Sequence, residues 1–274
     1  PPPPPPTPHD ALPILMKTRH WNWLGDNNFG KKNMINNFCV SLPANWPRCT
    51  SCHIGYGWED DNFDFSDPNN IDCLICHDRS GTSKKTPTGA GMPDPSVDLV
   101  KVAQSVGRTT NKSCSSCHFN GGGGSGVKHG DLTASMDNPS PALDFHMGEL
   151  GFSCSDCHAG ENHRILGASH GSMLTGSNHM SCLDCHSETP HAKKIVNDHV
   201  SSVACETCHI PAFAREEPTK TWWDWSTAGQ DISLEADEFG KPVYDKKKGD
   251  FTWEKNVIPE YRWYNGKAEY YKAG

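Results

Sequence analysis

Twelve of the 13 cysteines in this 274-residue chain occur in pairs with one fixed spacing. Two residues separate the cysteines of each pair, and a histidine directly follows the second cysteine. The resulting C-x-x-C-H units are CTSCH at 49–53, CLICH at 73–77, CSSCH at 114–118, CSDCH at 154–158, CLDCH at 182–186 and CETCH at 205–209. Zinc ribbons, structural disulfides and redox C-x-x-C pairs require no histidine at that place. The pattern is the attachment signature of c-type haem, in which both thiols bond to the porphyrin and the histidine binds the iron.

The six motifs predict six covalently attached haems. The attachment cysteines are Cys49, Cys52, Cys73, Cys76, Cys114, Cys117, Cys154, Cys157, Cys182, Cys185, Cys205 and Cys208. The proximal iron ligands are His53, His77, His118, His158, His186 and His209. Unless a site is left open, each iron also needs a distal ligand, and nine histidines lie outside the motifs.

Among these nine, the favoured distal ligands are His20, His129, His146, His163, His170 and His191. The less favoured ones are His9, His179 and His199. A haem bound by two histidines has no free coordination site, so it carries electrons without binding a substrate.

The composition predicts a chain that lacks a large side-chain core of its own. Hydrophobic residues make up 35% of the sequence, below the usual value of about 45–50%. The chain also contains 25 glycines and 21 prolines, and successive motifs start only 23 to 41 residues apart. We therefore expect a mostly irregular fold with short α-helices and little β-structure. It is a multihaem cytochrome c fold organised around a closely packed chain of haems.

Three regions are expected along the chain. Residues 1–13 begin with P-P-P-P-P-P-T-P and predict an extended, proline-rich arm, which is either a solvated spacer or a docking segment. Residues 14–214 carry all the motifs and predict one hexahaem domain. Residues 215–274 have no cysteine or histidine but are rich in tryptophan and tyrosine. This last segment is expected to be a cap over haem edges or an interface.

The charge balance excludes some classes of partner. The chain has 25 basic and 33 acidic residues, a formal net charge of −8, whereas binding to nucleic acid calls for a basic face. It contains no run of 18 apolar residues that would span a membrane. The first residue is not methionine and no signal-peptide core is present, so a processed form is expected. Because c-type haem is attached outside the cytoplasm, we expect a periplasmic or extracellular, cell-surface location. The expected partners are other redox proteins or further copies of this chain.

Several segments resemble the octahaem tetrathionate reductase family of cytochromes. They are KTRHWNW (17–23), GKKNMINNFCV (30–40), NWPRCTSCHIGYGW (45–58), NIDCLICHDRSGT (70–82), CSSCHFNGGGGSGVKHGDL (114–132) and CSDCHAGENHRILGASH (154–170). The resemblance covers roughly residues 17 to 270 and extends well beyond the C-x-x-C-H units.

The resemblance implies a substrate site at the first motif. In the family, a lysine replaces histidine as distal ligand of one haem, and Lys128 matches that lysine for the haem on Cys49, Cys52 and His53. A lysine amine binds iron only when it is unprotonated, and burial lowers its pKa in that direction. The one cysteine outside the motifs, Cys39, matches an unpaired cysteine beside the family's active haem. A thiol near a cationic iron shifts toward thiolate and could bind sulfur compounds. The alternative for Cys39 is a buried, unreactive thiol.

The chain also departs from the family. The family has one haem before the KTRHWNW-like segment and one after the tryptophan-rich region, and neither has a counterpart here. An acidic residue of the family, a few positions before the lysine, is replaced by Ser125.

Two functions are consistent with the sequence. The first is electron transfer from haem to haem, with the chain-terminal segments joining copies head to tail into a conductive filament. The second is a terminal reductase of tetrathionate, nitrite or hydroxylamine that acts at the lysine-ligated haem.

Overall fold

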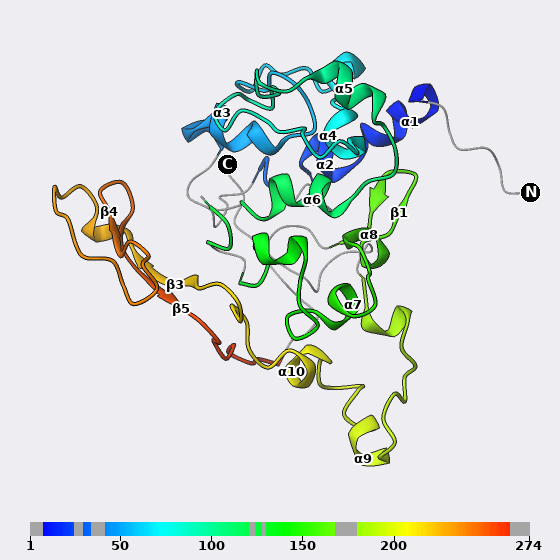
Figure 1. Ribbon diagram of the computed structural model, residues 1–274, viewed down its shortest axis with the longest axis vertical. Coiled ribbons are helices and arrows are strands. Elements are labelled where there is room, and N and C mark those ends of the chain that lie inside the picture. Colours follow the sequence, from blue (N-terminus) through cyan, green and yellow to red (C-terminus); the bar gives the residue numbers. More distant parts are fainter. Residues whose placement is uncertain are drawn as a thin grey trace, which may run out of the picture. The chain divides into compact units, whose positions relative to one another are not determined.

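The computed structural model describes residues 8–24, 30–33, 42–120, 124–127, 130–167 and 180–263. This part of the chain consists mostly of loops, with short helices and two small antiparallel sheets (Figure 1). Its longest helices, α1 (Pro8–Leu15) and α6 (Asn111–His118), have only eight residues each. The predicted fold class, irregular with short helices and little β-structure, is confirmed. Frequent glycine and proline interrupt both helices and strands, which explains why the elements stay short.

The chain divides into two compact units. The described residues of unit 1 fall within Pro1–Cys117 and Phe152–Met180, and those of unit 2 within His118–Gly151 and Ser181–Trp263. The range 14–214, expected to form one hexahaem domain, therefore contributes to both units. The division into arm, haem domain and cap was based on where the haems attach, and it stays a prediction.

Unit 1 contains most of the described helices. Its elements are α1, α2 (Arg19–Asn22), η2 (Leu42–Ala44), α3 (Trp46–Cys49), η3 (Thr50–Cys52), η4 (Pro68–Asn70), α4 (Leu74–His77), α5 (Leu99–Gln104), α6 up to its last residue, α8 (Cys154–Cys157), β1 (Gly160–Glu161) and β2 (Arg164–Ile165). The strands β1 and β2 pair antiparallel and form a small hairpin.

Aromatic and branched side chains form the core of unit 1. The buried members of its two clusters are Trp21, Ile54, Ile71 and Ile75 in the first and Trp23, Leu42 and Trp58 in the second. Phe63 and Phe65 pack against both clusters, so the two clusters form one continuous aromatic core. This core surrounds the first C-x-x-C-H motif, because the fully buried His53 lies between the rings of Trp21, Trp23 and Trp58.

Residues 8–15 form the helix α1, so the expectation of an extended arm through residue 13 is wrong from residue 8 onward. Pro8 is tolerated at the first helical position because the first N–H groups of a helix have no partner within it. Asp10 lies in the first turn, where a negative charge is favourable. Pro13 removes one internal hydrogen bond, but Leu12 and Leu15 pack against the core. Burial of these side chains stabilises a helix that the prolines alone would disfavour.

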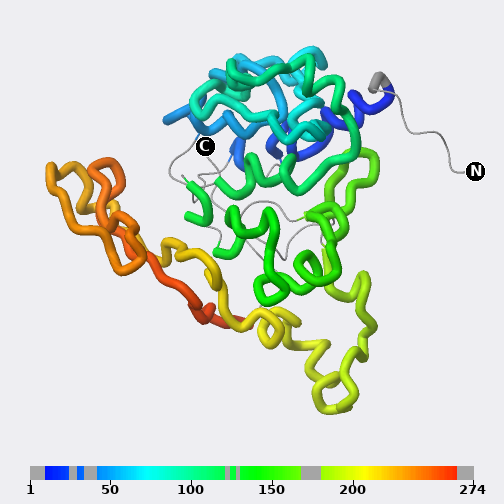
Figure 2. The backbone as a smooth tube through the Cα atoms, in the orientation of Figure 1, coloured from blue at the N-terminus to red at the C-terminus, as the bar shows by residue number. Residues whose placement is uncertain are grey.

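Unit 2 contains a three-stranded antiparallel sheet in the order β3–β5–β4. Its elements are η5 (Ala134–Asp137), α7 (Phe145–Gly148), η6 (Cys182–Asp184), α9 (Lys194–Asn197), α10 (Glu206–His209), β3 (Thr219–Asp224), η7 (Trp225–Thr227), β4 (Tyr244–Asp245) and β5 (Gly249–Glu254). Figure 2 shows β3 and β5 running side by side as a long ribbon. Along β5, Phe251 and Trp253 are buried whereas Thr252 and Glu254 are exposed, the alternation of a strand with one covered face.

Arg215 links two separate segments of unit 2. Its backbone N–H and its Nε donate to the carboxylate of Asp131 at 2.6 and 3.2 Å. Its guanidinium also donates to the carbonyl of Ala142 at 3.2 Å and to that of Leu143. A planar guanidinium can satisfy several acceptors at once, so this single side chain holds the loop before α7 against the segment that leads into β3.

None of the described helices is long and apolar enough to cross a membrane.

Candidate haem-binding site

Each C-x-x-C-H motif lies on about one turn of helix. The second motif ends with α4, the third forms the end of α6 and the sixth ends with α10. The first, fourth and fifth lie on α3 with η3, on α8 and on η6. Residues three and four apart are neighbours on a helix surface. One turn therefore brings both cysteines and the histidine to the same side, as attachment to one flat group requires.

Two of these turns begin at the same kind of cap. The carboxylate of Asp156 accepts a hydrogen bond from the backbone N–H of Ser153 at 2.6 Å, and that of Asp184 accepts from Ser181 at 2.9 Å. In both cases the sequence is S-C-x-D-C. A serine followed three residues later by an acceptor side chain satisfies free N–H groups at a helix start. The residues between the cysteines thus fix where the motif turn begins.

Two motif histidines are oriented by backbone carbonyls. Nδ1 of His77 lies 2.8 Å from the carbonyl oxygen of Gly107, and the N–H of Gly107 donates back to the carbonyl of His77 at 3.0 Å. Nδ1 of His158 lies 2.9 Å from the carbonyl oxygen of Leu166. A carbonyl acceptor places the ring proton on Nδ1. This tautomer leaves the lone pair of Nε2 for a metal ion.

Three motif histidines each face a histidine from outside the motifs. The ring centres are 6.2 Å apart for His77 and His163, 6.1 Å for His146 and His186, and 5.9 Å for His191 and His209. An imidazole nitrogen binds a transition metal at about 2.0 Å and lies about 1.1 Å from its ring centre, so two imidazoles on one metal have centres about 6 Å apart. The observed spacings therefore fit an iron ion with two histidine ligands.

The hydrogen bonding of two of these rings also agrees with a metal ion between the paired histidines. Nδ1 of His163 and Nδ1 of His191 are buried and have no hydrogen-bond partner. A buried polar atom without a partner is costly, and a metal ion bound at Nδ1 would supply that partner. In addition, burial lowers the pKa of His163, and nearby His77 acts in the same direction. The neutral form, which is the one that binds metal, is favoured.

The hairpin β1–β2 presents His163 at its tip. Asn162 and His163 both have positive φ, at 48° and 63°, between paired residues of the two strands. Two successive residues of positive φ are the geometry of a tight two-residue hairpin turn, and asparagine is favoured at its first position. The strained turn therefore serves to bring the His163 ring to His77.

A side-chain amide, rather than a hairpin turn, positions His191. The side chain of Asn197, at the end of α9, accepts from the backbone N–H of His191 at 2.9 Å and donates to its carbonyl at 2.7 Å. The backbone of His191 is thus fixed from both sides, and its ring lies nearly parallel to that of His209, with an interplanar angle of 17°.

His53 has a different environment from the other motif histidines. It is fully buried, and its Nε2 lies 2.5 Å from the carbonyl oxygen of Trp21. Burial lowers its pKa to about 3, although the hydrogen bond to Trp21 acts in the opposite direction. Within the described ranges, its ring neighbours are the aromatic rings of tryptophan and phenylalanine rather than a second histidine.

Thiols of different motifs lie close enough to shift one another's pKa. Cys52 of the first motif pairs with Cys117 of the third, and Cys114 of the third pairs with Cys154 of the fourth. In unit 2, Cys182 of the fifth motif pairs with Cys205 of the sixth. Attachment points this close bring groups bound to these motifs into proximity.

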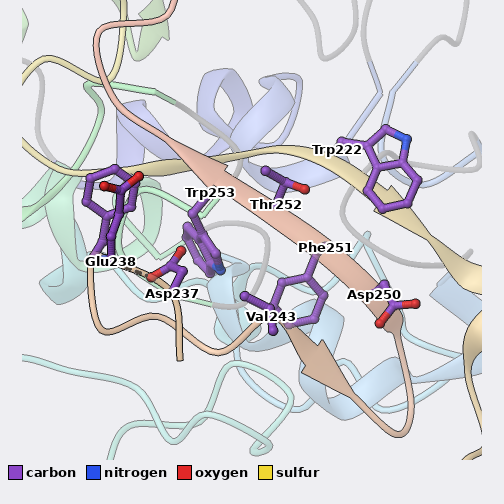
Figure 3. Close-up of a pocket in the computed structure, with 9 residues that line it drawn as sticks. Trp222, Asp237, Glu238, Val243, Asp250, Phe251, Thr252 and Trp253 are labelled. Carbon is purple, nitrogen blue, oxygen red and sulfur yellow. Dashed lines mark hydrogen bonds between the residues drawn. The ribbon is translucent and has the colours of Figure 1, made fainter. Parts of the chain in front are cut away.

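A cavity of about 390 Å³ lies against the sheet of unit 2 (Figure 3). Its walls include Trp222, Phe251 and Trp253, with the carboxylates of Asp237 and Asp250. No motif residue is among its lining residues, so this cavity is separate from the histidine pairs.

Comparison with known proteins agrees with this geometry. The octaheme cytochrome c from Shewanella oneidensis, a crystal structure, superposes with a TM-score of 0.87 at 51% sequence identity, over 96% of this chain and 61% of that one. A family model described as "Cytochrome c bacterial" matches residues 220–274. An uncharacterised protein of Archaeoglobus fulgidus is 27% identical over 175 residues, which are 57% of this chain and 58% of that protein. The chain spans about three fifths of the length of these relatives.

The chain belongs to the multihaem c-type cytochromes. The resemblance inferred from its motifs is confirmed. Its similarity to these cytochromes supports covalently bound c-type haem. The family model matches the aromatic-rich segment, which has no attachment motif of its own.

Not all of the expected ligands can be placed in the cytochrome. Five of the named residues lie outside the described residues: Cys39, Lys128, His129, His170 and His179. For His9 only the backbone, in α1, is described. Burial, followed by the charge of Arg19, lowers the pKa of His20. The side chain of His199 is exposed.

Sequence reasoning missed the residues that orient His77. Asp78 follows the second motif directly, and its carboxylate accepts from the N–H of Ser80 and of Ser83 at 2.7 and 2.8 Å and from the hydroxyl of Ser105 at 2.9 Å. These bonds hold the loop that carries Gly107. The carbonyl of Gly107 has no sequence signal, because every residue has one. The run D-R-S-G-T-S after the motif does carry a signal, since aspartate commonly bonds to serine residues that follow it.

We predict that Asp78→Asn destabilises the cytochrome by about 1–2 kcal/mol at pH 7, because an amide nitrogen cannot accept these bonds. Burial acts to raise the pKa of Asp78, but the serine hydrogen bonds lower it from 3.8 to about 2. A lowered pKa stabilises the folded state above the unfolded value. The difference between parent and variant should thus be constant above about pH 5 and shrink as the pH falls from about 4 toward 2.

Urea unfolding at pH 7 and pH 3 measures this difference. Asp60→Asn is the matched control, because Asp60 is exposed and accepts one local bond, from Asn62. An equal loss of stability at both pH values would show that the charge of Asp78 is not the cause.

Proposed function

We propose that this cytochrome binds six haems, one on each C-x-x-C-H motif, and conducts electrons between redox partners outside the cytoplasm. The observation that carries the proposal is the set of three histidine pairs with ring centres 5.9 to 6.2 Å apart. An iron with histidine on both sides has no open position for a substrate. Bound haem supplies a one-electron redox couple, and the chain fixes where each couple lies.

The pairs support a distal ligand for each of three motifs. His163 is the distal ligand for the second motif, His146 for the fifth and His191 for the sixth. For the first, third and fourth motifs, the candidates are Lys128 and the remaining histidines, with His20, His129 and His170 favoured. The close thiols of neighbouring motifs support transfer between haems, since they bring the attachment points of the first, third and fourth motifs together.

We predict that His163→Met, His146→Met and His191→Met each change the axial ligation of one haem out of six, with no loss of covalent haem. Magnetic resonance and absorption spectra of the oxidised protein report the ligation, and mass spectrometry counts the haems. His199→Met is the control, because His199 is exposed and is not part of a pair. Parent-like spectra of all three ligand variants would refute the assignment.

We further propose that copies of the cytochrome assemble head to tail into an extracellular filament. Exposed apolar side chains near the end of the described chain support this, among them Trp222 at 53%, Ile258 at 74% and Trp263 at 85% exposure. Exposed aromatic side chains of this kind are enriched at protein interfaces. A contact between two different surfaces repeats without closing and gives an open chain of subunits.

Electron microscopy of the purified cytochrome over a range of concentrations tests the filament. We expect uniform filaments, and the double variant Trp222→Ser, Trp263→Ser should need at least about tenfold more protein to form them. Val100→Ser is the control, since Val100 is an exposed apolar residue of α5 (67% exposed). Discrete particles at every concentration would contradict the proposal.

A second candidate function is the terminal reduction of tetrathionate, nitrite or hydroxylamine at the first motif. The observation that favours it is the environment of His53, which is buried among tryptophan and phenylalanine rings instead of facing another histidine in the described part. Lys128 would be the distal ligand there, and Cys39 would lie beside the substrate; both lie outside the described residues.

If the cytochrome is such a reductase, Lys128→His and Cys39→Ala should lower turnover of one of these substrates by about tenfold or more. Lys247→His is the control, because it places the same substitution at an exposed lysine. Parent-like turnover of both site variants would remove the reductase from consideration.

A further inference from the structure

A buried ion pair lies between the first two haem-attachment motifs. Nζ of Lys85 is 3.4 Å from Oδ2 of Asp72, and the two side chains are only 6% and 5% exposed. Removing two charges from water is strongly unfavourable before their attraction is counted. Apolar side chains of similar size often stabilise such a place as well or better. Stability alone therefore does not account for a charge pair here.

Lys85 holds the backbone of the first motif. Its ammonium donates to the carbonyl oxygen of His53 at 2.6 Å and to that of Gly55 at 3.1 Å. Gly55 has no room for a side chain, since a Cβ there would lie 2.7 Å from the Trp21 ring and 2.8 Å from the His53 ring. The backbone can thus come close enough for the ammonium to reach both carbonyls. The positive charge is placed against the residue that supplies the first iron ligand.

Asp72 holds the start of the second motif. Its Oδ1 lies 3.1 Å from the N–H of Leu74 and 3.2 Å from that of Ile75, in the first turn of α4. Its own N–H donates to the carbonyl of Ile54, next to the first motif, at 2.7 Å. The negative charge is therefore placed at the motif of Cys73, Cys76 and His77. One ion pair joins the two motifs, with its positive end on the first and its negative end on the second.

We propose that Lys85 and Asp72 are positioning residues that lock the first two motifs together and set the reduction potentials of the haems attached there in opposite senses. A positive charge near a redox centre favours the reduced form, and a negative charge favours the oxidised form. With both charges present, the haem potentials lie between the values expected with Lys85 charged alone and with Asp72 charged alone. This inference rests on the proposed binding of haem at the first and second motifs.

The test is a spectroelectrochemical titration of the purified haem-loaded cytochrome at pH 7. Lys85→Met leaves the carboxylate unbalanced and should move the potential of at least one haem downward. Asp72→Asn keeps an oxygen acceptor for the α4 cap, leaves the ammonium unbalanced and should move a potential upward. The double variant should return toward the parent. Lys84→Met is the control, because Lys84 is 59% exposed and pairs with Asp94 at the surface.

Shifts of opposite sign support the inference, because a purely structural disturbance has no reason to change sign with the charge that is removed. Shifts of the same sign in both single variants, or none, overturn it. If Lys85→Met does not fold, the test rests on Asp72→Asn: a raised haem potential supports the inference, and an unchanged or lowered one overturns it. Mass spectrometry of the peptides 49–53 and 73–77 separates the two proposals. Absence of haem from them in the parent refutes the six-haem proposal, whereas bound haem with unmoved potentials refutes only the role of the ion pair.

Discussion

The proposed haem ligation imposes a requirement for distance, because a metal ion shared by two imidazoles needs ring centres about 6 Å apart. This cytochrome meets the requirement three times with described residues, and it does so with different local structures. A hairpin tip carries His163, the short helix α7 carries His146, and a loop held by Asn197 carries His191. The loops and short elements of the fold are understandable as means of bringing these rings to their motif partners.

A structural feature can be predicted from the sequence when the residues that cause it are close together in the chain. The attachment cysteines and histidines follow from a five-residue pattern, and the irregular fold follows from composition. The partner of His77 could not be identified among nine spare histidines, because His163 is 86 residues away and nothing local marks it. The helix α1 was missed because proline is a strong local signal against a helix, whereas the burial of Leu12 and Leu15 is a tertiary effect. The Lys85–Asp72 pair was missed for the same reason.

The two units are stabilised in different ways. Unit 1 has an aromatic core that encloses His53, with Trp21 and Trp58 fully buried. The described part of unit 2 buries Phe251 and Trp253 at its sheet and Phe119, Leu143 and Ala214 elsewhere. Its remaining order rests on polar links such as those of Arg215 and Asn197.

The unequal sequence separations of the three histidine pairs affect how the chain matures. His191 and His209 are 18 residues apart, whereas His77 and His163 are 86 apart. Closing a long loop costs more entropy than closing a short one, and contacts distant in sequence form slowly. During synthesis from the N-terminus, His77 also exists long before His163 does. If these pairs ligate haem iron as proposed, nearer histidines can occupy the place of His163 in the meantime, and exchange of the wrong ligand for the right one is then a slow step that the 191–209 pair does not face.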